Sequence, residues 1–369
     1  MTDYKRNFAD KLRALRRAKG MTQRELSERV GFSEKTVSKW ECGVGMPDID
    51  TLFRIAELFG TGLVSLFEGG ERFCLGIDGG GTKTALCLAD RTGQPIRTLT
   101  LGSSNPMDLG FDAATSVLRE GIREVLDGIP PSAVACFAGL SGGGNTHMRA
   151  RMAEFFRSFG FLAFDNDSDN RNTVAAALGD ADGVAVILGT GICAYTQKSG
   201  EHIRTGGWGY LFDGGGSAYD LGRDALRAYF LAQDGCGMAS ALTEEVARLH
   251  GGSADDVLRD AYAGGKRAIA AFAPAVFRAI ERGDGAAVRL LEDNLAHAAD
   301  IIRTAARPLE GCVSVCLVGG LTAQPLVENT LRRMLGDAER YTISVVDTPP
   351  VLGAVSLACK LLLAKENHL

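Results

Sequence analysis

Hydrophobic positions follow two different patterns along the 369-residue chain. In the first 70 residues they recur at helical spacing, as at Phe8, Leu12 and Leu15, which indicates amphipathic helices. From residue 73 they form short apolar runs that end in glycine turns, and the first of these runs is 73–77. Apolar runs of this length, bounded by glycine, are typical of buried strands. The pattern therefore predicts a helical N-terminal region, residues 1–70, followed by an α/β body.

The first apolar run is followed by a glycine turn and by a second run at 84–89. Three glycines let the backbone take positive φ and approach a ligand closely. Exposed N–H groups with a hydroxyl and a lysine beside them form a nest for phosphate oxygens. The phosphate-binding residues expected here are Gly79, Gly80, Gly81, Thr82 and Lys83. Asp78, at the end of the first strand, is placed to hold Mg²⁺. An ordinary glycine hairpin is the alternative.

Two better-known phosphate motifs do not fit this turn. A P-loop needs Gly-Lys-Thr at a spacing that is absent, and a dinucleotide fingerprint needs a helix where a second strand follows. A second apolar run, turn and run occupy 184–195, with Gly189, Thr190 and Gly191 in the turn. This second copy, about 110 residues after the first, indicates an internal duplication in which each half offers a phosphate loop.

The N-terminal helices carry recognisable start and stop signals. Thr22 and Glu25 form a capping box, and Ser33 caps a third helix over Glu34 to Glu41. Gly20 ends the first helix, and the segment from Pro47 starts a fourth helix that reaches Phe59. Short helices with a tight turn between the second and third predict a helix-turn-helix bundle.

These 70 residues resemble the Cro/repressor-type (xenobiotic-response-element) helix-turn-helix family. The resemblance implies double-stranded DNA as a partner, a recognition helix at 34–40 in the major groove, and a homodimer. The residues expected to contact DNA are Gln23, Lys35, Thr36, Ser38 and Lys39. Val37 and Trp40 are expected to pack inside the bundle. The alternative is a plain helical bundle whose charges only face solvent.

The stretch 206–222 is the most diagnostic part of the body. It reads Gly-Gly-Trp-Gly, followed by a Gly-Ser pair that opens a helix. Together with the two hairpins, it resembles the N-acetylglucosamine kinase and BadF/BadG-type ATPase family of the sugar-kinase/heat-shock-ATPase/actin superfold. The resemblance covers roughly 73–365 and implies a two-lobed, ribonuclease H-like fold that uses ATP, Mg²⁺ and an amino-sugar substrate.

The resemblance implies one catalytic carboxylate, which orients and deprotonates the attacking hydroxyl. Asp169 fits, since a small-residue helix follows it and the second Gly-Thr-Gly stands about 20 residues later. Asp167 is the fallback. The alternative is that these carboxylates only cap the helix near 171–178. A calcium loop is rejected because Asn170 and Ala176 occupy positions that require Gly and Glu.

The remaining site residues also come from the resemblance. Asn105 is expected to contact a sugar hydroxyl, although an Asn-Pro turn explains it equally well. Ser141 and Gly142 are weak candidates for the sugar side of the cleft. Gly207 and Asp213 are expected to bind sugar hydroxyls. Gly319 and Gly320, after a strand at 312–318, are expected to lie against the adenine or ribose of ATP.

Two departures from the family pattern affect the expected activity. The family's usual Gly-Thr-Gly-Ser motif has Ile192 in place of its final Ser in this chain. The usual Asp-Glu-Gly-Ser motif is also altered, with Gly at positions 214 and 215. Both departures are expected near the substrate or phosphate edge, where they bear on sugar identity and turnover.

Composition narrows the function classes further. The sequence contains no run of 18 or more apolar residues, so no membrane span is expected. The charged N-terminus lacks a signal-peptide core. The chain has nine cysteines and no C-x-x-C pair, which predicts reduced thiols and a cytoplasmic location. Its five histidines are scattered along the sequence, so no zinc site is expected. Residues 1–70 hold 12 Lys and Arg against 10 Asp and Glu, whereas the rest holds 28 against 35. That asymmetry is typical of a nucleic-acid reader joined to an acidic enzyme body.

The sequence thus predicts three domains: helix-turn-helix at 1–70, a first kinase-like lobe at 71–182, and a second at 183–369. Only 69–71 separate the first two, a linker too short for free tethering. The expected function is an ATP-dependent N-acetylhexosamine kinase that carries a DNA-binding domain. The alternative is a sugar-sensing transcription regulator whose kinase-like body binds ligand without turnover. A third possibility, an activator ATPase of a partner enzyme, requires cluster-ligating cysteines that the sequence does not show.

Overall fold

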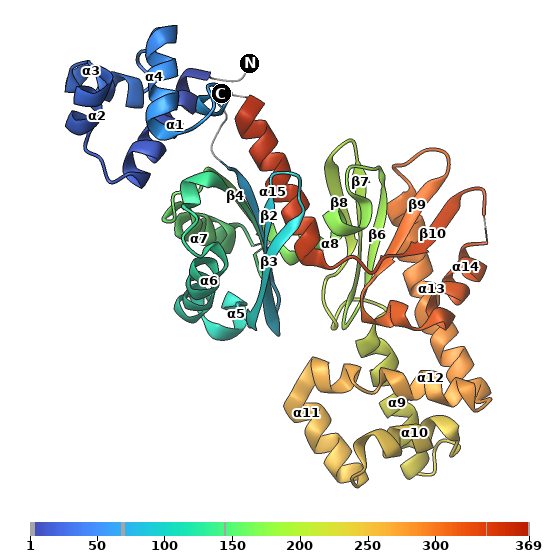
Figure 1. The fold of residues 1–369 in the computed structure, drawn as a ribbon. Coiled ribbons are helices and arrows are strands. Elements are labelled where there is room, and N and C mark those ends of the chain that lie inside the picture. The colour runs from blue at the N-terminus through green and yellow to red at the C-terminus, as the bar shows by residue number, and fades with distance from the viewer. Residues whose placement is uncertain (1–3, 68–70, 144, 337, 368–369) are drawn as a thin grey trace. The chain divides into compact units, whose positions relative to one another are not determined.

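The N-terminal region is an all-helical bundle in the computed structural model, which describes residues 4–67, 71–143, 145–336 and 338–367 (Figure 1). Its elements are α1 (Tyr4–Ala18), α2 (Gln23–Val30), α3 (Glu34–Glu41), α4 (Ile49–Phe59) and the 3₁₀ turn η1 (Val64–Leu66). Phe8, Leu12, Val37, Trp40 and Ile55 share one buried core. The linker glycines 69 and 70 lie outside the described residues.

The predicted helix signals are present in this bundle. Thr22 and Glu25 close a reciprocal capping box, and Ser33 accepts a hydrogen bond from the N–H of Thr36. Gly31, in the turn between α2 and α3, has φ +77°, which glycine adopts without steric cost. Local side-chain bonds of this kind explain why these boundaries could be read from the sequence.

The chain divides into two compact units: residues 1–170 with the segment from Ala354 on, and Arg171–Gly353. The sequence-based division placed the second boundary after residue 182 and the whole C-terminus in the second lobe. In the structure, the first unit gives way to the second within α8 (Asp169–Leu178), between residues 170 and 171. The chain returns to the first unit within α15 (Pro350–Asn367), at Ala354. Among the described residues, no helix has the length and apolarity that a membrane span requires.

The first unit contains a five-stranded sheet in the order β3-β2-β1-β4-β5. The strands are β1 (Phe73–Gly79), β2 (Lys83–Asp90), β3 (Pro95–Gly102), β4 (Val134–Leu140) and β5 (Ala163–Ser168). β1–β2 and β2–β3 pair antiparallel, whereas β1–β4 and β4–β5 pair parallel.

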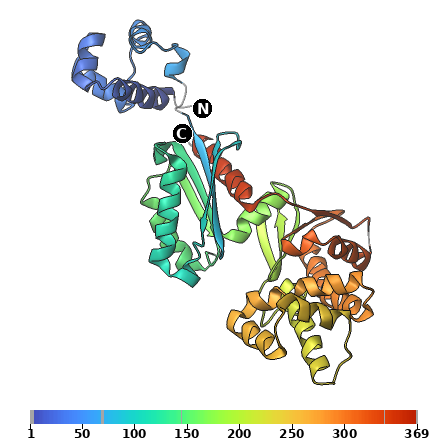
Figure 2. The same ribbon diagram turned by 60° about the horizontal axis from the view of Figure 1, so that its bottom comes forward.

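Helices cover both faces of this sheet (Figures 1 and 2). One face packs on α6 (Phe111–Leu126) and α7 (Thr146–Arg157) through a core that includes Leu75, Leu118 and Phe156. The other face packs on the final helix, where the Sγ atoms of Cys74 and Cys359 are 2.9 Å apart. The short α5 (Pro106–Leu109) and the 3₁₀ turn η2 (Pro131–Ala133) complete the unit.

The second unit repeats the topology of the first, since its sheet order is β10-β9-β6-β7-β8. The strands are β6 (Gly183–Leu188), β7 (Ile192–Lys198), β8 (Glu201–Gly206), β9 (Val313–Val318) and β10 (Tyr341–Val345). β6–β7 and β7–β8 are antiparallel, and β6–β9 and β9–β10 are parallel. The internal duplication predicted from the two hairpins is therefore confirmed at the level of sheet topology.

Alternate residues of β6 enter different cores. Val184 and Val186 pack in the core built with α13 (Gly285–Ala306), whereas Ala185 packs with Val174 and Leu178 of α8. Burial on both faces explains the continuous apolar run in this strand. A helical insertion follows β8 and consists of α9 (Ala218–Gln233), α10 (Ala241–His250), α11 (Ala254–Ala270) and α12 (Ala273–Glu281). The 3₁₀ turn η3 (Gly320–Ala323) and α14 (Pro325–Leu335) lie between β9 and β10.

Candidate functional site

The first predicted phosphate loop is the tight turn between β1 and β2. The N–H of Gly80 donates to the carbonyl of Lys83 at 2.9 Å, and the side chains of Thr82 and Lys83 are exposed. Positive φ was expected from the glycines here, but neither Gly79 nor Gly80 adopts it. Gly79 is required for a different reason: a Cβ there would stand 2.5 Å from Leu140 Cδ2 and 2.6 Å from Ser104 Oγ. Crowding by Leu140 and Ser104 therefore explains the glycine at position 79.

Asp78 lies half-buried at the end of β1, in register with Ala85 of β2 and Gly139 of β4. Mg²⁺ in nucleotide sites is held by one or two carboxylates together with phosphate oxygens and water. One carboxylate between two small neighbours, beside the turn, fits that coordination. Among the residues that the structure describes, no group of three or more His, Cys, Asp or Glu could hold a metal by itself. Mg²⁺ binding here would therefore depend on the phosphates.

Asp169 begins α8, and its carboxylate accepts hydrogen bonds from the Ser141 hydroxyl and the Asn170 N–H. Burial raises the pKa of the Asp169 carboxyl above its ordinary value, and these two hydrogen bonds only partly oppose that rise. Ser141 also donates its own N–H to the carbonyl of Gly79 at 2.7 Å. One serine thus joins the candidate base to the strand that carries the first phosphate loop.

Asp167, the fallback base, has a different environment. Its Oδ2 lies 3.6 Å from an Arg149 guanidinium nitrogen, and Asp165 lies 3.3 Å from another nitrogen of the same group. Half of the Arg149 side chain is exposed. The two carboxylates of β5 therefore share one half-exposed arginine, whereas Asp169 is the buried carboxylate with the raised pKa.

Asn105 caps α5 and stands close to the same group of residues. Its Oδ1 accepts from the N–H of Met107 at 3.0 Å, and its Nδ2 donates to Asp108 at 2.7 Å. A Cβ on Gly142 would lie 3.3 Å from that Oδ1. The Asn-Pro turn is therefore present, and the sugar contact stays a prediction. The first unit brings Asn105, Ser141 and Asp169 together beneath the first glycine turn.

The second predicted phosphate loop connects β6 to β7. The N–H of Gly189 donates to Gly191 at 3.0 Å, and Thr190 is exposed. Gly319, after β9, has φ +112°, and a Cβ there would stand 2.5 Å from the Leu188 carbonyl oxygen. Nothing lies within 4 Å of the equivalent point on Gly320. The predicted adenosine and phosphate segments are therefore neighbours within the second unit.

Ile192 was expected near the substrate or phosphate edge, and its Cδ1 lies 2.8 Å from where a Cβ on Gly216, in the predicted substrate loop, would stand. Its side chain is 2 % exposed and belongs to the core shared with Val186 and Ala298. The backbone turns at Gly191, so the first side chain of β7 points inward. Its presence is therefore a matter of packing, and it leaves the loop backbone intact.

The loop from Gly206 to Gly216 connects β8 to α9. The Asp213 carboxylate accepts the N–H groups of Trp208 at 3.1 Å and Gly209 at 2.9 Å. It closes the loop on itself, and its predicted contact with sugar hydroxyls stays a prediction. Gly207 has φ +74° and lies against Cys193, 2.7 Å from where its Cβ would be. Trp208, Leu211 and Phe212 are each at least 70 % exposed.

Three residues near these loops were missed by sequence reasoning. His297 of α13 accepts the Gly214 N–H at 3.3 Å and fills the space in which a Cβ at 214 would stand. Asn294, one turn earlier, is 5 % exposed, and its Oδ1 has no hydrogen-bond partner among the described residues. Lys266 of α11 approaches Gly191. Their only sequence signal was weak: the Gly264-Gly265 pair before Lys266, in a segment assigned to packing.

The predicted DNA contacts lie on and beside α3. Lys35 and Lys39 are exposed, and Thr36 and Ser38 are partly so, whereas Val37 and Trp40 are buried, as predicted. The Gln23 side chain donates to Glu41 at 2.8 Å. Burial acts to raise the pKa of the Glu41 carboxyl, but hydrogen bonds from Arg16 and Gln23 outweigh it and hold that pKa below its usual value. The exposed face of α3 is thus fixed from behind by a buried charge pair.

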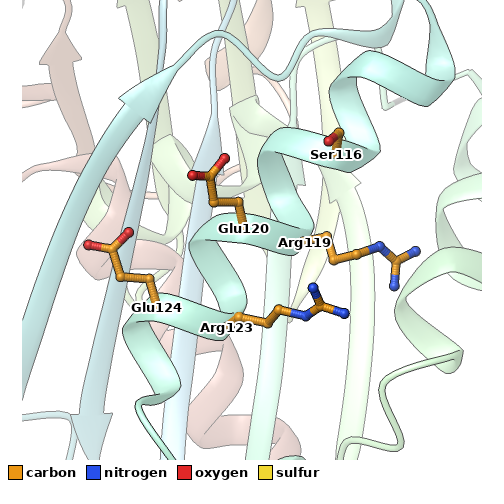
Figure 3. A pocket seen from close by; sticks show the side chains of 5 residues that line it. All are labelled: Ser116, Arg119, Glu120, Arg123 and Glu124. Atoms are coloured by element: carbon orange, nitrogen blue, oxygen red, sulfur yellow. The ribbon is translucent and has the colours of Figure 1, made fainter.

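A shallow hollow on α6 lies outside both groups of candidate residues (Figure 3). It is lined by Ser116, Arg119, Glu120, Arg123 and Glu124, all exposed side chains of one helix. None of them was predicted as a site residue, and the arginines and glutamates balance in charge. The hollow is a solvated helix face.

Comparison with known sequences assigns the body and the N-terminal bundle separately. The profile of the BadF/BadG/BcrA/BcrD ATPase family matches residues 75–358. The chain belongs to that family. A helix-turn-helix profile matches residues 12–66, ahead of the ATPase family body. The predicted recognition and fold class are thus confirmed: a helix-turn-helix bundle precedes an α/β, two-sheet, actin-like fold.

Relatives of this BadF/BadG/BcrA/BcrD member include named kinases. An N-acetylmuramic acid/N-acetylglucosamine kinase of Clostridium acetobutylicum is 29 % identical over 232 residues, which cover 60 % of this chain and 75 % of that protein. The solved structure of a putative N-acetylglucosamine kinase from Chromobacterium violaceum has a TM-score of 0.65 at 28 % identity, and covers 78 % of this chain and 99 % of its own. A ROK family transcriptional regulator, homologue of the E. coli MLC protein, shares the fold alone, with a TM-score of 0.52 at 13 % identity over 99 % of both chains.

Proposed function

We propose that the body of this protein is an ATP-dependent kinase of an N-acetylhexosamine, with N-acetylglucosamine as the first substrate to test. The observation that carries the proposal is the placement of Ser141, whose hydroxyl binds the Asp169 carboxylate while its N–H holds the β1 carbonyl of Gly79. Within the first unit, Ser141 thereby links the candidate base to the candidate phosphate loop. That pairing is what phosphoryl transfer to an alcohol requires.

The chemistry would be an in-line displacement. The Asp169 carboxylate would orient a sugar hydroxyl and accept its proton as the oxygen attacks the γ-phosphorus of ATP and ADP leaves. Backbone N–H groups of the two glycine turns would hold the phosphates. Bound Mg²⁺ would neutralise charge between phosphate oxygens, and Asp78 would hold it. A raised pKa suits Asp169 to this role, because a stronger base accepts the proton more readily.

The sugar class is supported by the named relatives and by the 206–216 loop. The Clostridium relative is named for N-acetylmuramic acid and N-acetylglucosamine, and the Chromobacterium structure for N-acetylglucosamine. In this chain, His297 occupies the space beside Gly214, and the open Asn294 acceptor lies beside Gly215. These two side chains are the place where its sugar preference would differ from that of its relatives.

The test is sugar-dependent ADP release by the full chain with Mg-ATP. We expect Asp169→Asn to lower the rate by about 10²- to 10⁴-fold, because an amide cannot accept the proton. Asp167→Asn is the matched control and should stay within a few fold, since that carboxylate is paired with the half-exposed Arg149 instead of lying beside Ser141. No sugar-dependent ADP release by the wild type, with N-acetylglucosamine or other amino sugars, would contradict the proposal.

A second candidate function is a sugar-responsive transcription regulator that binds DNA as a homodimer. The observation that favours it is the helix-turn-helix bundle itself, with Lys35 and Lys39 exposed on α3 and the helix anchored by Glu41. In this proposal the body binds a sugar or sugar phosphate, and the bound state changes DNA affinity. The two functions are compatible, and they separate on whether ADP is released.

A further inference from the structure

The two phosphate loops differ in charge, although their hairpins share one topology. In the first hairpin, β2 opens with Lys83, which is exposed beside the turn. In the second, β7 opens with Ile192, which is 2 % exposed in the core. A nest of backbone N–H groups binds phosphate more strongly with a cation beside it. The second loop therefore has no cation of its own at the position where the first loop has a lysine.

The ammonium group of Lys266 lies where that missing cation would be needed. A Cβ built on Gly191 would stand 3.2 Å from Lys266 Nζ. The same Nζ lies 5.9 Å from the centre of the Tyr210 ring, and Tyr210 packs edge-on against Tyr219. Within the part of the chain that the structure describes, Lys266 forms no ion pair, although its side chain is partly buried. A partly buried lysine that lies beside a glycine turn and has no carboxylate partner favours the binding of an anion.

The path of α11 explains why this side chain reaches the loop. Gly265 has φ +56° and ψ −141°, which breaks the helix one residue before Lys266. Val257 and Ala261 hold the first part of α11 in the core, and Ile269 packs against that core after the break. Since φ in this range is strained for residues other than glycine, the break is fixed at this point of the sequence. Lys266 is thereby the first residue after the break in α11.

We propose that Lys266 binds the polyphosphate of the nucleotide at the Gly189–Gly191 loop, as a charge contact supplied by the helical insertion. The proposal rests on the kinase function above and adds a phosphate ligand to it. Its three N–H donors and fixed positive charge match phosphate oxygens. Adenosine, which carries no phosphate, would not contact it.

The test measures affinities of the full-length protein for ATP, ADP and adenosine by calorimetry. We expect Lys266→Met to weaken ATP and ADP binding about ten- to a hundredfold, because one charge-assisted hydrogen bond is lost. Adenosine binding should not change, and Lys266→Arg should recover part of the loss. Lys198→Met is the matched control: it removes one positive charge from the other end of β7, where Lys198 binds the Pro308 carbonyl.

The outcomes separate the two proposals. If the wild type binds no nucleotide, the kinase function fails, and the role of Lys266 fails with it. If the wild type binds and phosphorylates but Lys266→Met binds ATP as tightly, only the lysine assignment is overturned. An equal loss for adenosine would also overturn it, because it would show that Lys266 supports packing. If Lys198→Met weakened ATP binding as much as Lys266→Met does, the loss of affinity would be an effect of net charge and the assignment of Lys266 would be overturned.

Discussion

Ser141 shows how much of the proposed chemistry depends on one small side chain. Its hydroxyl is bound to the carboxylate of Asp169, and this hydrogen bond favours the ionised form of a group whose pKa burial has raised. Asp169 therefore loses its proton at a higher pH than an ordinary aspartate does. Since only the ionised carboxylate can act as the base, the rate of transfer should fall as pH drops through that raised pKa.

Replacing Ser141 by alanine should shift this pH dependence to higher pH. Without the hydroxyl donor, the pKa of Asp169 rises further, so the acidic limb of the kcat/KM profile moves to higher pH. The measurement is sugar-dependent ADP release from pH 4 upward, with Ser168→Ala as a neighbouring control in β5. An unchanged acidic limb in Ser141→Ala would mean that Asp169 is not the group whose titration controls the rate.

At the same scale, packing and distance decided which residues the sequence could reveal. Asp169 could be proposed from the sequence because it sits beside a local signal, the start of a small-residue helix. The burial of the Ile192 side chain could not be predicted, because the inward turn of the first β7 side chain depends on tertiary packing. Lys266 was missed because its neighbour Gly191 lies 75 positions away in the chain, and only the fold brings them together.

The elements of the N-terminal bundle are joined by a charge pair that lies almost out of solvent. Glu41, at the end of α3, is 1 % exposed and binds the Arg16 guanidinium of α1 through both carboxylate oxygens, at 2.6 and 2.9 Å. Arg13 donates to the Glu41 carbonyl as well. The third helix is thus fixed to α1 by hydrogen bonds that all go to one residue, to the carboxylate and the backbone carbonyl of Glu41.

Glu41→Ala should destabilise this bundle by about 3 kcal/mol, because it leaves the Arg16 charge buried without its partner. Glu28→Ala is the control: its pair with Arg24 is exposed and contributes about 0.5 kcal/mol or less. Trp40 lies in the bundle and Trp208 in the body, so denaturant unfolding followed by fluorescence in a Trp208→Phe background reports on the bundle alone.

The lowered pKa of Glu41 also determines how the stability of the bundle should change with pH. Since the folded-state pKa is held below the usual value, the pair stabilises the bundle above that value, and the contribution is lost as pH falls through the folded pKa. The wild type should therefore lose more stability than Glu41→Ala on going from neutral pH to acid. Equal acid sensitivity of the two proteins would show that the pair contributes nothing.

Much of the element order was predictable because the signals are local. The caps at Thr22 and Ser33, the strand before each glycine turn and the helix after Ser217 lie where the sequence indicated them. Membership of the compact units was not predictable, because it depends on which faces bury one another. The final helix was assigned to the second lobe from its position in the chain, yet its buried stripe packs in the first unit.

At the scale of the whole molecule, a DNA reader and a duplicated ATPase-type body share one chain. If sugar binding regulates DNA affinity, the two sites must be coupled by a free-energy difference, and the coupling must act equally in both directions.

The measurement is the affinity of the full chain for its DNA at fixed salt, with and without saturating N-acetylglucosamine. We expect a change of at least fivefold, which corresponds to about 1 kcal/mol of coupling. Lys35→Ala combined with Lys39→Ala is the control and should weaken DNA binding whether or not sugar is present. Unchanged affinity with sugar bound would separate the two functions, and would leave a kinase that happens to be joined to a DNA-binding domain.

The last helix has a further consequence for how this protein is made. Ala354, Val355, Ala358 and Leu362 are buried, and Cys359 meets Cys74 of the strand that opens the body. A ribosome completes β5 long before it reaches this helix, and at 5–20 residues per second the delay is about 10 to 40 s. Throughout that interval, one apolar face of the first sheet in the nascent chain is not yet covered by α15. Nascent chains of this protein should therefore depend on chaperones until α15 has been synthesised.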